Sequence, residues 1–309
     1  MHPALSIIFF TVTTGLGFGW VTVGIGLHES ALAPYASVEQ ALWTGGVALI
    51  VISAGLASSA LHLANPKNFW RSFMRVRTSW LSREAVLAVA FYPFMLIYLI
   101  ADQESHLARF SGVLCVLIAL VTVFSTAMIY ACLRTIRQWN TALTPVSFLL
   151  MALALGAIAT AAQHALVGGS ETQPVTRVAL LLLMGAFVSK LCYYLKIGLP
   201  DSTGIDTATG FRMARVRSLN MGETPRSFLT DEFNYQISRS RLLILKTITL
   251  GVGFVIPGIL LLNVEFGAGS GGVLLLALAL AYAGALVERW LFFAEAQHVV
   301  RLYHGQVQT

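Results

Sequence analysis

The chain has 309 residues, of which 57% are hydrophobic and 11% are charged, whereas soluble proteins carry about 25% charged residues. Its mean hydropathy is +0.75. A single soluble domain has no interior large enough for this much apolar surface, so lipid must be the solvent. The net charge of +6 comes from basic residues in loops beside apolar runs. That pattern is typical of membrane topology and excludes nucleic acid as a partner.

The first apolar run extends from Ala4 to about Leu27. It follows no basic region and is longer than a cleaved signal segment, so we interpret it as a retained transmembrane helix. A span needs roughly 20 predominantly apolar residues. Eight segments qualify, near residues 4–27, 41–63, 84–101, 109–133, 144–167, 177–198, 241–262 and 270–293. The sequence therefore predicts an all-α integral membrane bundle of eight transmembrane helices, with residues 1–309 forming a single polytopic domain.

The connecting loops alternate in charge along the chain. The loops after the second, fourth and sixth spans carry fourteen Lys and Arg, whereas the four loops on the other side carry only Arg109 and Arg177. Cytoplasmic loops are enriched in Lys and Arg. We therefore expect a multi-pass protein of the bacterial inner membrane, with both termini and the three basic loops in the cytoplasm.

The loop between the second and third spans joins two ionisable residues at span ends. His62 closes the second span and Glu84 opens the third, so consecutive crossings return both to the same membrane surface. Quinone chemistry moves protons as well as electrons, and a histidine that titrates near neutral pH can relay a proton to a nearby carboxylate. Ionisable residues at membrane depth are functional candidates by default. We predict a quinone-binding and proton-relay site at His62 and Glu84.

Each member of this pair also has a structural explanation. Ser82 is a suitable N-cap, which places Glu84 in the first helical turn, where the helix dipole favours a carboxylate. His62 alone would be an interfacial histidine bonded to a carbonyl group. Trp70 and Trp80 flank the same loop and fit an interfacial aromatic belt. The pair therefore supports the site better than either residue does.

Two surfaces are candidates for docking a soluble subunit. The longest loop, at about 199–240, mixes acidic, basic and aromatic residues, and loops of this length are usually functional or disordered. The other surface is the basic loop after the second span, where the candidate docking residues are Arg71, Arg75, Arg77 and Arg83. Their alternative role is membrane topology alone.

Three further ionisable residues lie within spans, namely Lys190, Lys246 and Glu288. Snorkelling of the side chain towards the interface accounts for the lysines. A pair between Glu288 and a lysine, or a second proton route, is the alternative. Cys115, Cys132 and Cys192 lie in apolar runs without the spacing of a disulfide framework or metal site. We predict no metal ligands and no catalytic residue on this chain.

Two other classes of membrane protein stay open on the residues alone. A haem cytochrome needs paired axial histidines at one depth, and no two histidines here lie mid-span at matched depth, so no haem is expected. A transporter is compatible with eight spans and a few buried charges. However, the two halves of the chain do not show paired broken helices, and the ionisable residues cluster towards one face.

A resemblance to a known family appears in the loop after the second span, which reads ALHLANPKNFWRSF and then RTSWLSREAV. An HLG-x-P-like stretch, a basic loop and a Ser-x-Glu start to the next span resemble the membrane-anchor subunit of the dimethyl-sulfoxide-reductase-type molybdoenzymes. Ala64 stands where that family usually has Gly. The stretches STAMIYACLRTIRQWNTALTP and ERWLFFAEAQHVVRLYHG are also similar to this family, so the resemblance covers nearly the whole chain.

The resemblance implies a three-subunit oxidoreductase complex. Its partners would be an iron–sulfur subunit with four 4Fe-4S clusters and a catalytic subunit with a molybdenum bis-guanine-dinucleotide (molybdopterin) cofactor. The anchor would be haem-free and would contact membrane lipid and a quinone, either menaquinone or ubiquinone. The family's quinol-site histidine and glutamate fall on His62 and Glu84.

Two directions of electron flow fit the resemblance. One is quinone reduction by a cytoplasmic sulfite dehydrogenase. The stretches RTSWLSRE and ERWLFFAEAQHVV are more similar in sequence to the anchor of this branch. The other is quinol oxidation for an S-oxide reductase of the DMSO type, often with exported catalytic subunits. Because the basic loops are predicted to be cytoplasmic, sulfite oxidation is the preferred interpretation.

Overall fold

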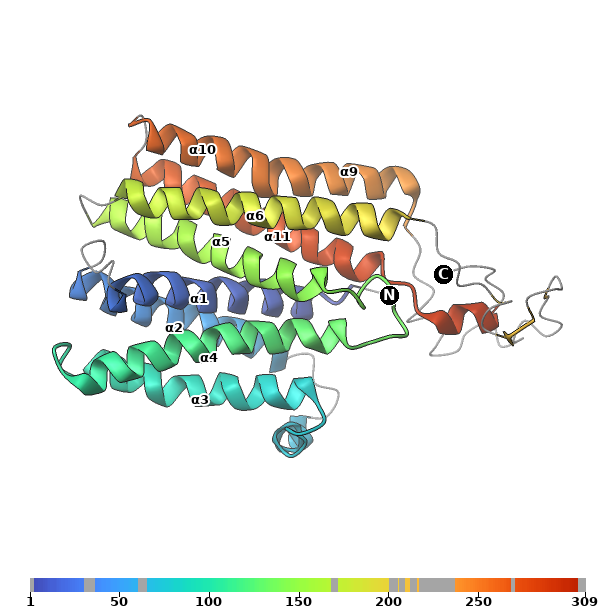
Figure 1. Cartoon of the computed structure of the whole chain (residues 1–309), viewed down its shortest axis with the longest axis horizontal. Coiled ribbons are helices and arrows are strands. Elements are labelled where there is room, and N and C mark those ends of the chain that lie inside the picture. The colour runs from blue at the N-terminus through green and yellow to red at the C-terminus, as the bar shows by residue number, and fades with distance from the viewer. Residues whose placement is uncertain are drawn as a thin grey trace.

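The computed structural model describes residues 3–30, 37–60, 66–167, 172–199, 205, 209–211, 216, 237–267 and 270–304. These residues form a bundle of long, roughly parallel helices (Figure 1). The elements in chain order are α1 (Leu5–Glu29), α2 (Val38–Ala60), η2 (Pro66–Phe73), α3 (Trp80–Ile100), α4 (His106–Ala131), α5 (Leu143–Leu166), α6 (Thr172–Gly198), α9 (Arg239–Leu250), η3 (Gly251–Val255), α10 (Ile256–Glu265), α11 (Gly271–Ala294) and η4 (Val299–His304).

Eight helices in the described part of the chain are long and apolar enough to cross a membrane, with α9, η3 and α10 together forming the seventh span. The prediction of an all-α bundle of eight spans is confirmed. The turn η3 is π-helical and ends two residues before Pro257 in the seventh span. Proline lacks a backbone N–H group, and π-helical turns accommodate such interruptions inside long helices.

The central helices are α1 and α5, which are the most buried spans. They touch at Gly19 and Gly156, where a Cβ atom on Gly19 would lie 1.8 Å from the backbone oxygen of Ala152. Small residues permit such close backbone contact between helices in lipid. On one side, α1 contacts α2 and α4, and α3 packs on α4; on the other side, α5 contacts α6 and α11.

The two ends of the bundle differ in charge. We call the end at which α1, α3, α5 and α9 begin the basic end. Its described basic residues include Lys67, Arg71, Arg75, Arg77, Arg83, Arg134, Arg137, Lys196, Arg239 and Arg241. At the opposite end, Arg109 lies 3.7 Å from Glu29 and Arg177 lies 2.6 Å from Glu265. The opposite-end arginines are therefore each matched by a carboxylate.

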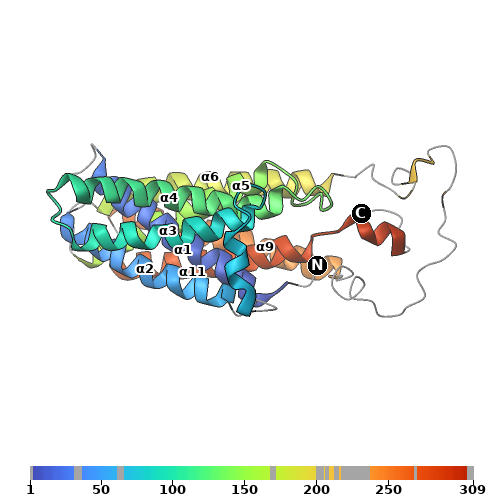
Figure 2. The same ribbon diagram turned by 90° about the horizontal axis from the view of Figure 1, so that it is seen from below.

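The element η2 lies across the basic end, perpendicular to the spans; it is seen end-on in Figure 1 and side-on in Figure 2. It exposes Phe69 and Trp70 together with Arg71. This orientation is typical of an interfacial segment that lies in the plane of a membrane. The predicted docking loop at 199–240 lies mostly outside the described residues.

Candidate functional site

Glu84 lies in the second turn of α3 and is 5% exposed. The prediction that Ser82 caps this helix is wrong, because α3 begins at Trp80 and the Ser79 side chain accepts a hydrogen bond from the Ser82 backbone N–H. The helix therefore starts one turn earlier and carries Glu84 deeper into the bundle. The first-turn dipole effect consequently does not account for this carboxylate.

The Glu84 carboxyl group receives a hydrogen bond from the Thr126 hydroxyl of α4 at Oε1. The other oxygen, Oε2, has no hydrogen-bond partner within the described part of the chain. A buried carboxylate with an unused oxygen, one to two turns from the basic end, is a chemically available acceptor. His62 lies outside the described residues, so its predicted pairing with Glu84 stays a prediction.

The candidate docking arginines differ in their surroundings. Arg71, Arg75 and Arg77 are exposed at the basic end. Arg83 instead donates hydrogen bonds to the carbonyl oxygens of Val76 and Arg77, at 2.9 and 2.8 Å. Its guanidinium also lies 4.1 Å from the centre of the Trp80 ring. Arg83 thus holds the chain entering α3, whereas the other three remain accessible to a partner.

A charged cluster of Lys190, Glu288 and Arg289 lies inside the bundle, between α6 and α11. The Lys190 ammonium pairs with Glu288 Oε1, and the Arg289 guanidinium lies 3.3 Å from Glu288 Oε2. All three side chains are at most 5% exposed. Snorkelling is therefore the wrong explanation for Lys190, and the alternative pairing with Glu288 is confirmed.

The second predicted lysine, Lys246, forms a separate pair. Its ammonium group lies 2.6 Å from Glu295, which ends α11, and its side chain is 21% exposed. This pair reaches the surface at the basic end, so it is more accessible than the charged cluster.

Sequence reasoning missed Arg289, although it directly follows Glu288 in an apolar run. Adjacent opposite charges inside a span were the available signal, since such residues rarely face lipid. Arg289 lies over the Phe148 ring at 3.5 Å from its centre. An aromatic group surrounds this contact, in which Tyr130, Trp139, Phe292 and Phe293 pack edge to face or stacked. Cation–π contact partly replaces the hydration that the guanidinium has lost.

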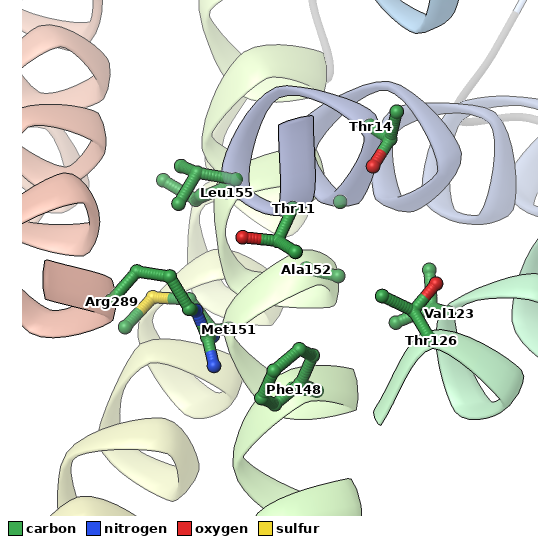
Figure 3. A pocket seen from close by; sticks show the side chains of 11 residues that line it. Thr11, Thr14, Val123, Thr126, Phe148, Met151, Ala152, Leu155 and Arg289 are labelled. Carbon is green, nitrogen blue, oxygen red and sulfur yellow. The ribbon is translucent and has the colours of Figure 1, made fainter. Parts of the chain in front are cut away.

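A small cavity lies between Thr126 and Arg289 (Figure 3). Its volume is about 20 Å³, and α1 contributes Thr11, Thr14 and Gly15 to its wall. Apolar residues of α5 close another side. Thr126 lines this cavity and also bonds Glu84. Glu84 is therefore linked through one hydroxyl group to a polar space that Arg289 of the charged cluster also lines.

The opposite half of the bundle contains a different kind of polar contact, centred on Gln163 of α5. Its side-chain oxygen accepts hydrogen bonds from the Trp20 indole N–H at 3.1 Å and the Thr44 hydroxyl at 2.9 Å. Its amide donates to the Gln40 carbonyl at 2.7 Å. This neutral network ties α1, α2 and α5 together.

Among the described residues, no group of three or more His, Cys, Asp or Glu side chains is arranged to hold a metal ion. The polar groups that converge at the basic end are carboxyl, hydroxyl, ammonium and guanidinium groups. They suit proton transfer and the binding of a polar ligand group.

Comparison with known proteins agrees with the fold of a membrane-spanning helical bundle. A model of the DMSO reductase anchor subunit (DmsC) family matches residues 1–294. The C subunit of the sulfite dehydrogenase of Allochromatium vinosum is 34% identical over 325 aligned positions, which cover 99% of this chain and 100% of that protein. With its eight apolar helices, this chain is a multi-pass membrane protein that belongs to the DMSO reductase anchor subunit (DmsC) family.

Proposed function

We propose that this chain is the haem-free, quinone-binding anchor subunit of a molybdenum oxidoreductase complex that oxidises sulfite. Family membership supports the role of anchor, and the full-length similarity to a sulfite dehydrogenase subunit supports the substrate branch. In this proposal, the molybdenum cofactor and the 4Fe-4S clusters reside on partner subunits. The anchor connects the iron–sulfur subunit to menaquinone or ubiquinone in the lipid.

The observation that carries the proposal is the buried carboxyl group of Glu84 with one unused oxygen near the membrane rim. A quinone, when bound, supplies two-electron and two-proton carrier chemistry. Its oxygens need a donor in one state and an acceptor in the other, and a carboxyl group can serve as both. The residues present therefore fit the head group of such a ligand.

Each residue of the site has a distinct part in this proposal. Glu84 exchanges the proton at its free oxygen, and Thr126 fixes the orientation of the carboxyl group through the bond to Oε1. His62 is the predicted second contact. Trp80 and Phe124 pack edge to face at 5.8 Å beside the entry of α3 and keep its surroundings apolar. This exclusion of water strengthens hydrogen bonds within the site.

Electrons would enter at the basic end, where the proposed iron–sulfur subunit docks. Arg71, Arg75 and Arg77 are exposed there and complement an acidic partner surface. Each exposed pair contributes little by itself, so docking would depend on several contacts together. By the enrichment of basic residues in cytoplasmic loops, this end faces the cytoplasm of a bacterium.

The quinone site is tested with Glu84→Gln and His62→Ala in the assembled complex. Loss of a positioned acid or base reduces rates by about 10²–10⁴-fold. We therefore expect quinone-linked sulfite oxidation to fall by that factor, while turnover with an artificial dye as electron acceptor stays normal. The matched control is Glu39→Gln, which makes the same change on an exposed residue of α2 at the opposite end. Unchanged quinone-linked turnover in Glu84→Gln would remove Glu84 from the site.

Orientation is tested by labelling with a membrane-impermeant thiol reagent in whole cells. Met74→Cys at the basic end should be protected, and Glu104→Cys at the opposite end should react. The exposed residues Cys132 and Cys192 are first replaced by serine. The reverse pattern would place the partner subunits outside the cytoplasm. It would favour the alternative of a quinol-oxidising anchor of an S-oxide reductase.

The composition of the purified complex separates an anchor from other membrane proteins. An anchor should copurify with subunits that contain molybdenum and iron–sulfur clusters, and without b-type haem absorbance from this chain. A chain that purifies alone and moves a solute into liposomes would instead support a transporter.

A further inference from the structure

The cavity between α1, α4, α5 and α11 has polar side chains from α1, α4 and α11 in a lining that is otherwise apolar. Its volume of about 20 Å³ exceeds the roughly 10–15 Å³ that one water molecule requires. A buried water also needs two to four polar partners. Thr11, Thr14, Thr126 and Arg289 line this space, so both conditions are met.

The hydrogen bonds of the threonines determine what they can offer to the cavity. Each hydroxyl carries one hydrogen and two lone pairs. Thr11 donates to the Ile8 carbonyl at 3.1 Å, and Thr14 donates to the Phe10 carbonyl at 2.7 Å. The Thr126 hydroxyl lies within hydrogen-bonding distance of two acceptors, the Glu84 carboxylate and the Thr122 carbonyl at 3.1 Å, and its one hydrogen is shared between them. With their hydrogens engaged, the three hydroxyls of these lining residues can serve a molecule in the cavity only as acceptors.

Arg289 supplies the complementary donors. A guanidinium has five N–H groups and no acceptor. One of its terminal nitrogens is 3.3 Å from Glu288, while its Nε atom is buried without a partner in the described structure. Thus an unsatisfied donor group and three hydroxyl acceptors border the same water-sized space. Only a molecule that accepts from one side and donates to the other satisfies both.

We propose that one ordered water occupies this cavity and that Arg289 acts through it as a positioning residue for Glu84. The guanidinium donates to the water, the water donates to Thr126, and Thr126 donates to Glu84. In this series, each group donates its hydrogen bond in the direction of the Glu84 carboxylate. Hydrogen bonds aligned in this way polarise one another and favour the charged form of the final acceptor.

The charges of the buried groups support the same arrangement. Lys190, Arg289 and Glu288 together carry a net charge of +1 when all are ionised. An uncompensated charge inside a bundle is costly. Glu295 lies within electrostatic range of Lys190 but already pairs with Lys246. The Glu84 carboxylate, which is bonded to the cavity-lining Thr126, would bring the total to zero.

The other charged groups on the neighbouring elements are few. On α4, Tyr130 lies within electrostatic range of both Glu84 and Arg289. The only described acidic or basic residue of α2, Glu39, lies at its opposite end. The ionisable residues of α1 and α5 also lie at the opposite end, in their last turns. The basic residues of η2 are exposed. The charged groups at the end of α11 and beyond it include Glu295, which pairs with Lys246, and the buried Arg301. Among the described residues that line the cavity, Arg289 is the only ionisable one, so changes at the cavity should act on Glu84 through this lining.

The decisive variant is Gly15→Ala, which reduces the cavity without removing a polar group. A Cβ atom on Gly15 would lie 3.7 Å from Ala152 Cβ, an ordinary contact within the cavity wall. Thr126→Val serves as the positive control because it removes the direct bond to Glu84. Thr122→Val is the matched negative control, since that hydroxyl lies one turn away on α4 and bonds only the Ile118 carbonyl.

Infrared spectroscopy of the assembled complex reads out the site without relying on turnover. The Glu84 carboxyl band is assigned by its loss in Glu84→Gln, and its titration is followed in each variant. We expect the midpoint of the Glu84 titration to move to higher pH by about one unit in Thr126→Val. In Gly15→Ala it should move in the same direction by a similar amount. No movement is expected in Thr122→Val. A water O–H band that shifts in H₂¹⁸O should be present in the wild type and missing in Gly15→Ala.

Two results would overturn the inference. One is the absence of that water band in the wild type. The other is a Gly15→Ala midpoint equal to the wild type while Thr126→Val shifts, which would mean that the hydroxyl acts alone. Arg289→Lys, which keeps the charge, should preserve the wild-type midpoint better than Arg289→Gln. The link to turnover rests on the proposed function. If Glu84→Gln retains quinone-linked activity, that function fails while the infrared result on the water still stands.

Discussion

The two halves of the bundle bury polar groups in different ways. Near the opposite end, Gln163 satisfies three neighbours with neutral hydrogen bonds. Near the basic end, the charged cluster and Glu84 are ionisable, and several of their polar atoms have no partner in the described structure. Neutral, saturated networks hold helices together, whereas unsaturated ionisable groups leave room for a ligand, a water or a proton. The contrast separates polar residues that build the bundle from those that can perform chemistry.

The strongest test of the contrast is Glu288→Gln. It leaves both Lys190 and Arg289 buried without a counter-ion, and removing one partner of a buried ion pair costs about 3–5 kcal/mol. Lys190→Met should cost less, because Glu288 and Arg289 remain as a pair. Thermal unfolding of the purified complex measures both. Equal losses in the two variants would show that the charge balance of the cluster does not govern stability.

The crossing of α1 and α5 lies between the two halves. Substitutions there should have the next largest effect on stability. In Gly156→Ala, the new Cβ atom would lie 2.1 Å from the Gly19 backbone. The helices must then separate, and overpacking of this kind costs about 1–3 kcal/mol. Gly46→Ala is the control because nothing lies within 4 Å of its added methyl group. A Gly156→Ala protein as thermostable as Gly46→Ala would contradict the close contact.

A smaller effect is expected from Gln163→Leu in the neutral network. The change leaves the Trp20 and Thr44 donors without their acceptor. Hydrogen bonds between membrane helices contribute about 0.6 kcal/mol on average, so the unfolding temperature should fall only slightly. Quinone-linked turnover should remain at the wild-type rate. A selective loss of turnover without loss of stability would place chemistry in the half that we assign to structure.

The smallest effect concerns pH at the segment that follows α11. Burial lowers the pKa of His298 below its ordinary value of 6.5. Its Nδ1 atom accepts a hydrogen bond from the Val300 N–H at 3.1 Å, which requires a neutral ring. Because the folded form resists protonation more than the unfolded form, stability from this contact is complete above about pH 6.5. It is lost as the pH falls through the lowered pKa.

Hydrogen exchange at the Val299 amide, which bonds the Thr135 carbonyl at 3.0 Å, reports this change. After correction for intrinsic rates, protection should weaken in acid in the wild type and stay constant with pH in His298→Gln. Equal acid sensitivity in both proteins would rule out His298 as the titrating group.

The sequence by itself determined the class of the fold and much of its organisation. Eight apolar runs of membrane length predict eight spans because each backbone polar group in lipid must be bonded within a helix. The charge alternation of the loops likewise separates the two ends. The resemblance at the loop after the second span identified the family that the comparisons confirm. These signals are local in the chain, so they can be read without coordinates.

Only the tertiary structure decided which polar side chains meet. Glu84 and Thr126 are 42 positions apart, and Lys190 and Glu288 are 98 positions apart. No local pattern specifies such pairs, because the rotation of each helix in lipid depends on its packing against neighbours. For the same reason, the sequence did not predict the contacts of Arg289 or the cavity beside it. The rim position of Glu84 was thus predictable, whereas the groups that surround it depended on how α1, α4, α5 and α11 pack.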